Sequence, residues 1–249
     1  MNPTAELGAS APLYRDVKRL LTQSIAAGEW RPGAALPSET RLAGRFKVSI
    51  GTLRKAIDEL VAERMVVRQQ GRGTFVATHS RSRLLFHFFH IVPHGGEKQY
   101  PETRMLSFRR SRARPEEAAK LGLAAAEPVL RICNLLCLGG KPAIVDDLVL
   151  PRRLFRNLTE KIFTGRDNTI YHLYQTRYGI NVLRTNERLR AVLAEGTAAR
   201  LLGVKKGAPL LQVNRIALSY HNAPVELRRS LVNTAAHEYL SELGRSERG

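Results

Sequence analysis

The stretch from residue 36 to residue 76 is the sequence feature that most constrains the fold. It predicts two short helices separated by a tight turn, followed by two strands joined by a basic, glycine-rich tip. Ser38 and Ser49 are suited to begin the two helices, because a serine oxygen accepts a hydrogen bond from a free backbone amide. Apolar residues recur at helical spacing after Ser49, which indicates one buried face. This order is typical of a winged helix-turn-helix, a module that places one helix in a DNA groove.

The polar face of the second helix and the tip between the strands carry the side chains expected to contact DNA. Short residues at the start of the helix allow a close approach to base edges, and an arginine reaches phosphate or base. A wing tip contacts the backbone or the minor groove. The alternative is a helical subdomain with a solvated charged face, and the attached wing argues against it. The predicted DNA-binding residues are Thr40, Arg41, Ser49, Gly51, Thr52, Arg54, Lys55, Gly71, Arg72 and Gly73.

Residues 12–78 resemble the DNA-binding domain of the GntR family of bacterial transcription regulators. The resemblance rests on Leu36-Pro37-Ser38-Glu39, Val48-Ser49, Thr52-Leu53-Arg54 and Gly71-x-Gly73-Thr74-Phe75-Val76. Thr40 and Ile50 depart from the family pattern, which often has arginine at the first position and usually has it at the second, and those arginines commonly contact DNA. We therefore expect DNA binding, but not the operator sequence that is usual for the family.

The charge of the chain also favours a polyanionic partner. The net charge is +18 and the isoelectric point is near 10.7, which is typical of proteins that bind nucleic acid. Residues 1–79 hold 12 lysines and arginines against 7 acidic residues, and residues 80–249 hold 28 against 15. The basic excess therefore does not locate the DNA site. At 249 residues the chain has room for one large domain or two modest ones.

The cysteines and the hydropathy pattern indicate a cytoplasmic protein, and the resemblance to bacterial regulators implies that it reaches the nucleoid through its operator. Cys133 and Cys137 lie four positions apart, which on a strand is roughly 13 Å and too far for a disulfide. Two free thiols suit a reducing cytosol. The sequence has no apolar run near the length of about 18 residues that a membrane helix needs, and no signal-peptide pattern. No membrane partner is expected.

The second half of the chain alternates strand and helix patterns. It predicts an α+β domain with an antiparallel sheet and helices on one side. The expected strands are Leu84–Val92, Arg104–Arg114, Pro128–Leu138, Pro142–Leu150, Ile180–Val192, Leu210–Tyr220 and Pro224–Val232. The expected helices are Pro115–Leu121, Pro151–Leu158, Ile170–Tyr178 and Glu195–Leu202. The predicted domains are a flexible N-terminus (1–11), a DNA-binding domain (12–78), a linker (79–83), an effector-binding and dimerisation domain (84–243) and a flexible tail (244–249).

Residues 80–243 resemble the UTRA domain, the ligand-sensing domain of the HutC-type branch of the GntR family, which is related in fold to chorismate lyase. The matching segments are Glu127-Pro128-Val129-Leu130, Gly140-Lys141-Pro142-Ala143, Gly207-x-Pro209-Leu210-Leu211 and Pro224-Val225-Glu226. The resemblance implies that a small effector binds between the two hairpins, on polar side chains of the strands. By position, the candidates are Asn134, Asp146, Glu187, Glu226, Arg228 and Ser230.

The residues present also bear on the class of effector. Family members that sense sugar phosphates carry two arginines on the first hairpin strand, and these align with Asn134 and Leu136 here. Arg131 is three residues from Asn134 and faces the other side of a strand. A sugar phosphate is therefore less expected than an organic acid, an amino acid derivative or an amine. Glu226 and Arg228 share one face and can hold a zwitterion, although an internal ion pair is the alternative.

No enzyme motif stands out in the sequence. A phosphate-binding loop, a dinucleotide fingerprint and a nucleophile elbow are all absent. His87, His90 and His94 have mixed spacing and no acidic neighbour, so no metal or cofactor is predicted. Fold likeness to a lyase does not transfer its activity. We predict a homodimeric repressor that binds an operator in duplex DNA and responds to an effector. A DNA-binding protein whose second domain only dimerises, and an enzyme with a DNA-binding domain, are the alternatives.

Overall fold

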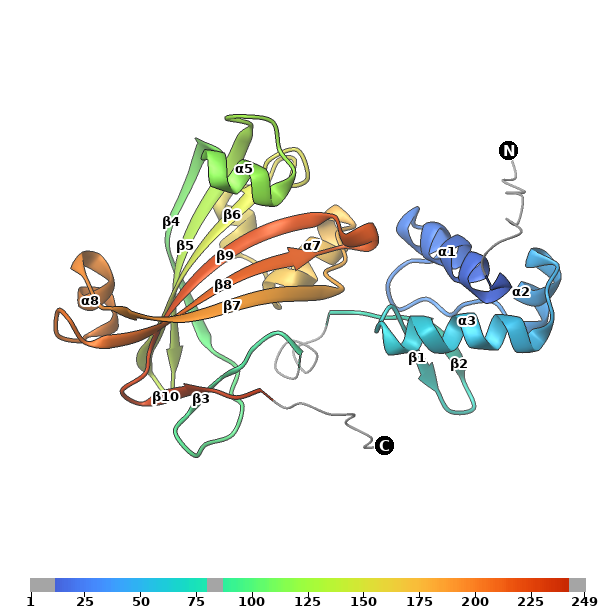
Figure 1. Cartoon of the computed structure of the whole chain (residues 1–249), viewed down its shortest axis with the longest axis horizontal. Helices are drawn as coiled ribbons and strands as arrows, with labels where there is room; N and C mark the ends of the chain where they lie inside the picture. Colours follow the sequence, from blue (N-terminus) through green and yellow to red (C-terminus); the bar gives the residue numbers. More distant parts are fainter. Residues whose placement is uncertain (1–11, 80–86, 242–249) are drawn as a thin grey trace. The chain divides into compact units, whose positions relative to one another are not determined.

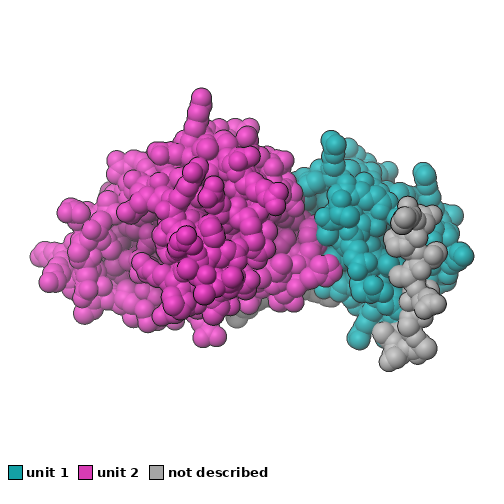
Figure 2. Space-filling view, turned by 90° about the horizontal axis from the view of Figure 1, so that it is seen from above, with its two compact units in different colours: residues 1–78 teal, residues 79–249 magenta. Residues whose placement is uncertain are grey.

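The computed structural model describes residues 12–79 and 87–241. The chain divides into two compact units, Met1–Thr78 and His79–Gly249, which are coloured separately in Figure 2. The predicted flexible ends (1–11 and 244–249) and most of the predicted linker lie outside the described residues. Each unit is described by itself below.

The first unit is a winged helix-turn-helix, as the sequence predicts (Figure 1). Ser38 Oγ accepts a hydrogen bond from the backbone amide of Arg41, and Ser49 Oγ accepts one from that of Thr52. Lys47 adopts a left-handed backbone conformation that ends the first of these two helices and makes the tight turn. The elements are α1 (Leu13–Ala26), α2 (Glu39–Phe46), α3 (Ile50–Ala62), β1 (Val66–Gln69) and β2 (Gly73–Val76).

The second unit is built on an antiparallel sheet with strand order β4-β5-β6-β9-β8-β7 (Figure 1). Each predicted hairpin is present, and β6 pairs with β9, so the two hairpins lie side by side. The strands are β4 (Glu102–Arg112), β5 (Pro128–Leu138), β6 (Lys141–Pro151), β7 (Arg184–Leu193), β8 (Pro209–Leu218) and β9 (Pro224–Asn233). A separate two-stranded sheet pairs β3 (Ile91–Pro93) with β10 (His237–Tyr239).

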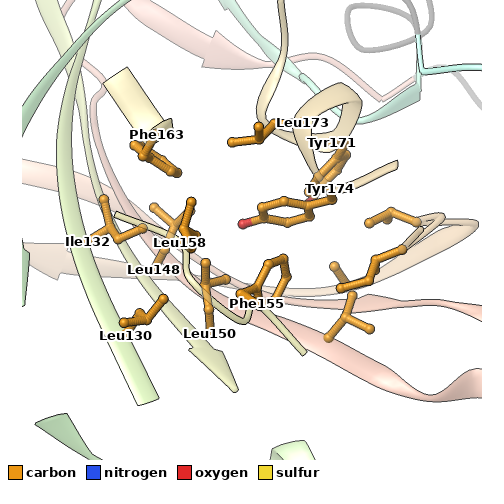
Figure 3. Close-up of a cluster of buried hydrophobic side chains, with 14 of the residues drawn as sticks. Leu130, Ile132, Leu148, Leu150, Phe155, Leu158, Phe163, Tyr171, Leu173 and Tyr174 are labelled. Atoms are coloured by element: carbon orange, nitrogen blue, oxygen red, sulfur yellow. The ribbon is translucent and has the colours of Figure 1, made fainter. Parts of the chain in front are cut away.

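Helices cover both faces of the large sheet, so the prediction of helices on one side is wrong. On one face, α6 (Glu160–Thr164), α7 (Ile170–Tyr178) and the segment before them bury a large aromatic and aliphatic cluster (Figure 3). On the other face, α5 (Pro115–Leu121) packs against Val129 and Val149, and α8 (Gly196–Leu202) packs against Leu135 and Val145. The reason is that β5 and β6 are apolar at both alternating sets of positions, so neither face can be left to water.

Three predicted elements differ from the structure. The strand predicted at Leu84–Val92 is limited to Ile91–Pro93, and residues 84–86 lie outside the described part. The helix predicted over Pro151–Leu158 is a series of turns. In these turns the backbone amide of Phe155 donates a hydrogen bond to the carbonyl of Arg152, and the amide of Leu158 donates one to the carbonyl of Phe155. The strand predicted from Ile180 begins only at Arg184. The described apolar residues that are buried here pack against side chains of neighbouring elements, without the repeated backbone bonding of a strand or helix; they are Phe88, Phe89, Phe155, Leu158, Ile180 and Val182.

Candidate functional sites

The predicted DNA-binding residues lie at the start of α2, in the first turns of α3 and at the wing tip. Thr40, Arg41 and the tip residues Gly71, Arg72 and Gly73 are exposed. The two tip glycines have positive φ angles of 70° and 111°, which other residues rarely adopt, so the tight turn requires them. This arrangement places Arg72 at the tip of the β1–β2 hairpin, where its guanidinium lies 5.8 Å from the centre of the Phe75 ring.

The polar residues of α3 are held by their neighbours. The hydroxyls of Ser49 and Thr52 are 2.9 Å apart and bond each other. Arg54 donates from Nε to Glu39 Oε2 at 2.6 Å and remains exposed, so its terminal nitrogens are free to reach a phosphate or a base. Lys55 instead lies over the ring of Tyr14 in α1, at 4.3 Å from the ring centre. The predicted residues are therefore not equally placed, and Arg54 is the best oriented of the cations on α3.

The candidate effector residues lie in two adjacent rows across one face of the second unit's sheet. Asn134 on β5 is opposite Asp146 on β6, which is opposite Ser230 on β9. In the next row, Arg228 on β9 is opposite Arg215 on β8, which is opposite Glu187 on β7. Glu226 follows on the same face of β9. The register of the strands thus brings the predicted residues together, with Arg215 as an addition.

Glu226 is enclosed by protein groups. It is 0% exposed, and its carboxylate accepts hydrogen bonds from the hydroxyls of Tyr171 at 3.2 Å and Tyr174 at 2.7 Å. Arg228 donates to both of its oxygens, at 3.0 and 3.2 Å, and lies over the ring of Tyr171. Burial and the neighbouring carboxylate raise the pKa of Tyr171 to about 12, so this hydroxyl stays a donor. All acceptor positions of Glu226 are engaged within the protein.

Glu187 belongs to a second group of bonded side chains. Arg215 donates from Nε to Glu187 Oε1 at 2.5 Å and from its terminal amino group to the carbonyl of Phe88. Tyr239 donates to the other oxygen of Glu187. Burial alone would raise the pKa of Glu187, but Arg215 beside it and Tyr239 hold the pKa below its usual value. This pair ties the segment at Phe88 to the sheet.

Asp146 and Asn134 differ from the other candidates because they have polar atoms without partners. Asp146 is 2% exposed; Oδ2 accepts from Arg228 at 3.2 Å, whereas Oδ1 has no hydrogen-bond partner. Asn134 is 0% exposed, and neither side-chain atom has a partner. Burial raises the pKa of Asp146, although Arg228 and the nearby hydroxyl of Ser230 act in the opposite direction. Unpartnered buried polar atoms are rare, because each costs roughly 1–3 kcal/mol.

Two small cavities adjoin Asp146, and Asn134 is not among the residues that line them. One has a volume of about 40 Å³ and the other about 30 Å³, and both are lined by Phe89, Leu136, Asp146, Arg215 and Arg228. The larger of the two is also lined by Arg166, from the loop before α7. A more open hollow of about 260 Å³ lies over α6 and the start of α7; Arg166 lines it as well, but Asp146 and Asn134 do not. The unpartnered buried oxygen of Asp146 therefore makes the two small cavities the better candidates for an effector site.

Arg166 lines one of these cavities and is not among the residues predicted from the sequence. Its guanidinium stacks on the ring of Phe163 at 4.6 Å and donates to the carbonyl of that residue. In the described part of the chain it makes no salt bridge with a carboxylate, and burial lowers its pKa. Arg215 was also missed, although the alternation Val213, Arg215, Ala217 along one face of a strand was a signal for an inward arginine.

The structure also bears on the predictions made for Arg131, for the two cysteines, for metal sites and for membrane-spanning helices. Arg131 bonds Glu117 of α5 at 2.7 and 2.6 Å, on the face away from Asn134, as predicted. Cys133 and Cys137 are free, and burial raises the pKa of Cys133 to about 12. Within residues 12–79 and 87–241, no group of three or more histidine, cysteine or acidic side chains is placed to hold a metal ion. No helix in those ranges is long and apolar enough to cross a membrane.

The stability of the second unit should depend on pH because of His90. Burial lowers the pKa of this side chain below its ordinary value of 6.5; Glu187 partly offsets this, while Arg215 and Lys98 add to it, and the ring lies 5.0 Å from that of Tyr239. The unfolded state therefore binds more protons just below pH 6.5, so the free energy of unfolding should fall as the pH drops from 7.5 to 5.5. Urea unfolding at both pH values measures this.

His90→Gln should make that pH dependence smaller, and His221→Gln, at an exposed position, should leave it unchanged. An equal slope in wild-type protein and His90→Gln would show that other groups cause the pH dependence.

Comparison with known protein families agrees with the fold of both units. Residues 97–238 match the UTRA domain, and residues 13–76 match the bacterial regulatory proteins of the gntR family. The solved ligand-binding domain of a candidate GntR-family transcriptional regulator from Bordetella bronchiseptica is 39% identical, covers 64% of this chain and 99% of that chain, and has a TM-score of 0.60.

Two full-length relatives are named as repressors. The probable fructoselysine utilization operon transcriptional repressor of Escherichia coli (strain K12) is 27% identical over 216 residues, which are 86% of this chain and 88% of that protein. The histidine utilization repressor of Pseudomonas putida is 28% identical over 214 residues, 85% and 84% of the two chains. With its winged helix-turn-helix and its UTRA domain, the chain belongs to the HutC-type branch of the GntR family of DNA-binding transcription regulators.

Proposed function

We propose that this repressor responds to a small effector that carries one carboxylate and a nearby amine or hydroxyl. The observation that carries the proposal is that one cavity is lined both by Asp146, whose Oδ1 lacks a donor, and by Arg166, which has no carboxylate partner among residues 12–79 and 87–241. An amine or hydroxyl of the effector would donate to Asp146 Oδ1, which faces the cavity lined by Arg166. The effector's carboxylate would bind the Arg166 guanidinium, which is suited to planar anions.

The charge around the cavity favours a carboxylate over a phosphate. Arg228 is neutralised by Glu226 and Asp146, and Arg215 by Glu187, so Arg166 is the cation left for an anionic ligand among the charged side chains named here. A carboxylate carries one negative charge, whereas a phosphate ester carries about −1.5 to −2 near neutral pH. Two of the relatives are named for the use of histidine, an amino acid, and of fructoselysine, an amino acid derivative, which supports the same class.

A thermal-shift screen with matched ligand pairs tests the proposal. Each pair differs in its anionic end, for example β-alanine with 2-aminoethyl phosphate, and glycerate with glycerol 3-phosphate, within a wider metabolite panel. A ligand at about 100 times its dissociation constant adds roughly 2.7 kcal/mol to the free energy of unfolding, which is readily measured. Stabilising ligands should be carboxylates that also carry an amine or hydroxyl.

Variants at the cavity separate specific binding from general effects. Asp146→Asn and Arg166→Gln should abolish the stabilisation by the identified ligand. Asp147→Asn is the matched control, because the neighbouring carboxylate faces the other side of β6 and pairs with Arg229. Stabilisation by phosphates but not by carboxylates would contradict the charge argument. No stabilising ligand in the whole panel would favour the alternative, in which the UTRA domain only mediates dimerisation.

The same proposal includes how the signal reaches DNA. The chain would act without catalysis, as a homodimer whose two winged helix-turn-helix units bind the two half-sites of an operator, since half-site spacing must match the separation of the recognition helices. The effector would shift the equilibrium between arrangements that match the spacing and arrangements that do not. Thr40, Arg41, Arg54 and the wing tip would make the DNA contacts.

A further inference from the structure

Ile50 is an exposed apolar side chain at the N-terminal end of α3. It is 41% exposed, whereas Leu53 and Ile57, which follow on the buried stripe of the helix, are 0% and 1% exposed. A β-branched side chain at the first helical position adds little to helix stability. Neither the core nor helix propensity therefore accounts for isoleucine at this position.

The side chains around Ile50 leave it as the main apolar surface of this turn. Ser49 and Thr52 bond each other through their hydroxyls, so their polar groups are directed into the cap of the helix. Arg54 is four residues later and lies on the same side of the helix, where Glu39 holds it. The first turn thus combines an apolar group with a nearby oriented cation.

Gly51 provides the second observation. A Cβ atom added at this glycine would meet Ser49 Oγ at 3.9 Å, which is ordinary contact, and its φ is not in the left-handed region. The fold of the free protein therefore does not require glycine here, and glycine weakens a helix relative to alanine. The absent side chain leaves space immediately beside Ile50, on the exposed surface, for a closely approaching partner.

We propose that Ile50 contacts the C5 methyl group of a thymine in the major groove and so fixes one base of the operator. Residues at the N-terminus of a recognition helix contact base edges. Among the four DNA bases, thymine presents a methyl group in the major groove, and apolar side chains bind it. An arginine at this position would instead favour guanine through its O6 and N7 acceptors. This inference rests on DNA binding by the family and is independent of the proposed effector.

Replacing thymine by uracil in the operator tests this contact, because uracil pairs in the same way and lacks only the methyl group. The operator is first selected from random duplex DNA with the full-length wild-type protein. Each thymine is then replaced singly by deoxyuridine, and equilibrium affinity is measured. At one thymine of each recognition-helix site the wild-type affinity should fall by about fourfold, the factor that corresponds to burying one methyl-sized group.

Variants of Ile50 make the test specific. Ile50→Ala should bind the thymine and uracil operators equally at that position, while Ile50→Val should keep most of the preference. Selection with Ile50→Arg should replace that thymine by guanine. Thermal melting of each variant shows whether folding is intact, which the high exposure of Ile50 predicts. The proposal is overturned if wild type and Ile50→Ala show the same uracil penalty at every thymine, or if the selected operator contains no thymine whose methyl group affects binding.

Discussion

Glu226→Ala should lower the free energy of unfolding of the UTRA domain by about 3–5 kcal/mol, as expected when one partner of a buried ion pair is removed. The change leaves the buried Arg228 with Asp146 as its remaining carboxylate, and it removes the acceptor of the Tyr171 and Tyr174 hydroxyls. For a unit of this size the melting temperature should fall by roughly 6–20 °C. Differential scanning calorimetry of the full chain measures the loss.

Two further variants show whether the position or only its charge matters. Glu226→Gln keeps an oxygen acceptor for one tyrosine and should cost less than alanine. Asp147→Ala removes an exposed carboxylate paired with Arg229 and should change stability by less than about 1 kcal/mol. A loss of similar size for Glu226→Ala and Asp147→Ala would contradict the structural role. The expected result assigns Glu226 to holding Arg228 and the two tyrosines in place, rather than to direct contact with an effector.

Arg54→Ala should weaken operator binding by about 5- to 160-fold, which corresponds to the range of about 1–3 kcal/mol typical for an arginine that contacts a base. The side chain is exposed, and Glu39 holds it through Nε, so its fork of terminal nitrogens is oriented before DNA arrives. Because an exposed ion pair contributes less than about 1 kcal/mol, the fold should be unaffected. Fluorescence anisotropy at several salt concentrations measures the affinity and its salt dependence.

Arg19→Ala is the matched control, because it removes the same charge from α1, where the arginine pairs with Asp16 on the helix surface. A uniform loss over all sequences, with a smaller salt slope, would assign Arg54 to a phosphate instead of a base. Equal losses for Arg54→Ala and Arg19→Ala would show that only net charge matters, and the recognition role would then be wrong.

Local signals in the sequence were sufficient for most of the fold. The hairpins β5–β6 and β8–β9 were predictable because glycine, asparagine and proline mark their turns and the strands are long. Phe88 and Phe89 were misassigned to a strand because an apolar run has the same composition whether it pairs or not. In the structure these rings are buried and the carbonyl of Phe88 accepts from Arg215, a distant residue that no local pattern specifies.

The candidate site was predictable only in part, for a similar reason. Glu226 and Arg228 are two apart on a strand, so their contact follows from strand periodicity. The position of Arg215 beside Arg228 depends on the register of β8 against β9, and Arg166 comes from an irregular loop. Strand register and loop conformation are set by tertiary packing, so these two arginines were not identified from the sequence.

The size of the two cavities beside Asp146 has a consequence for the time course of regulation. Volumes of about 40 and 30 Å³ hold one or a few water molecules each, so binding of the proposed effector at this place would require the segment with Phe89, which lines both cavities, to move. The association rate would then be limited by how often this segment opens, and it should level off at high ligand concentration. The same barrier would slow release, so the effector would stay bound to the repressor for some time after its concentration in the cell has fallen.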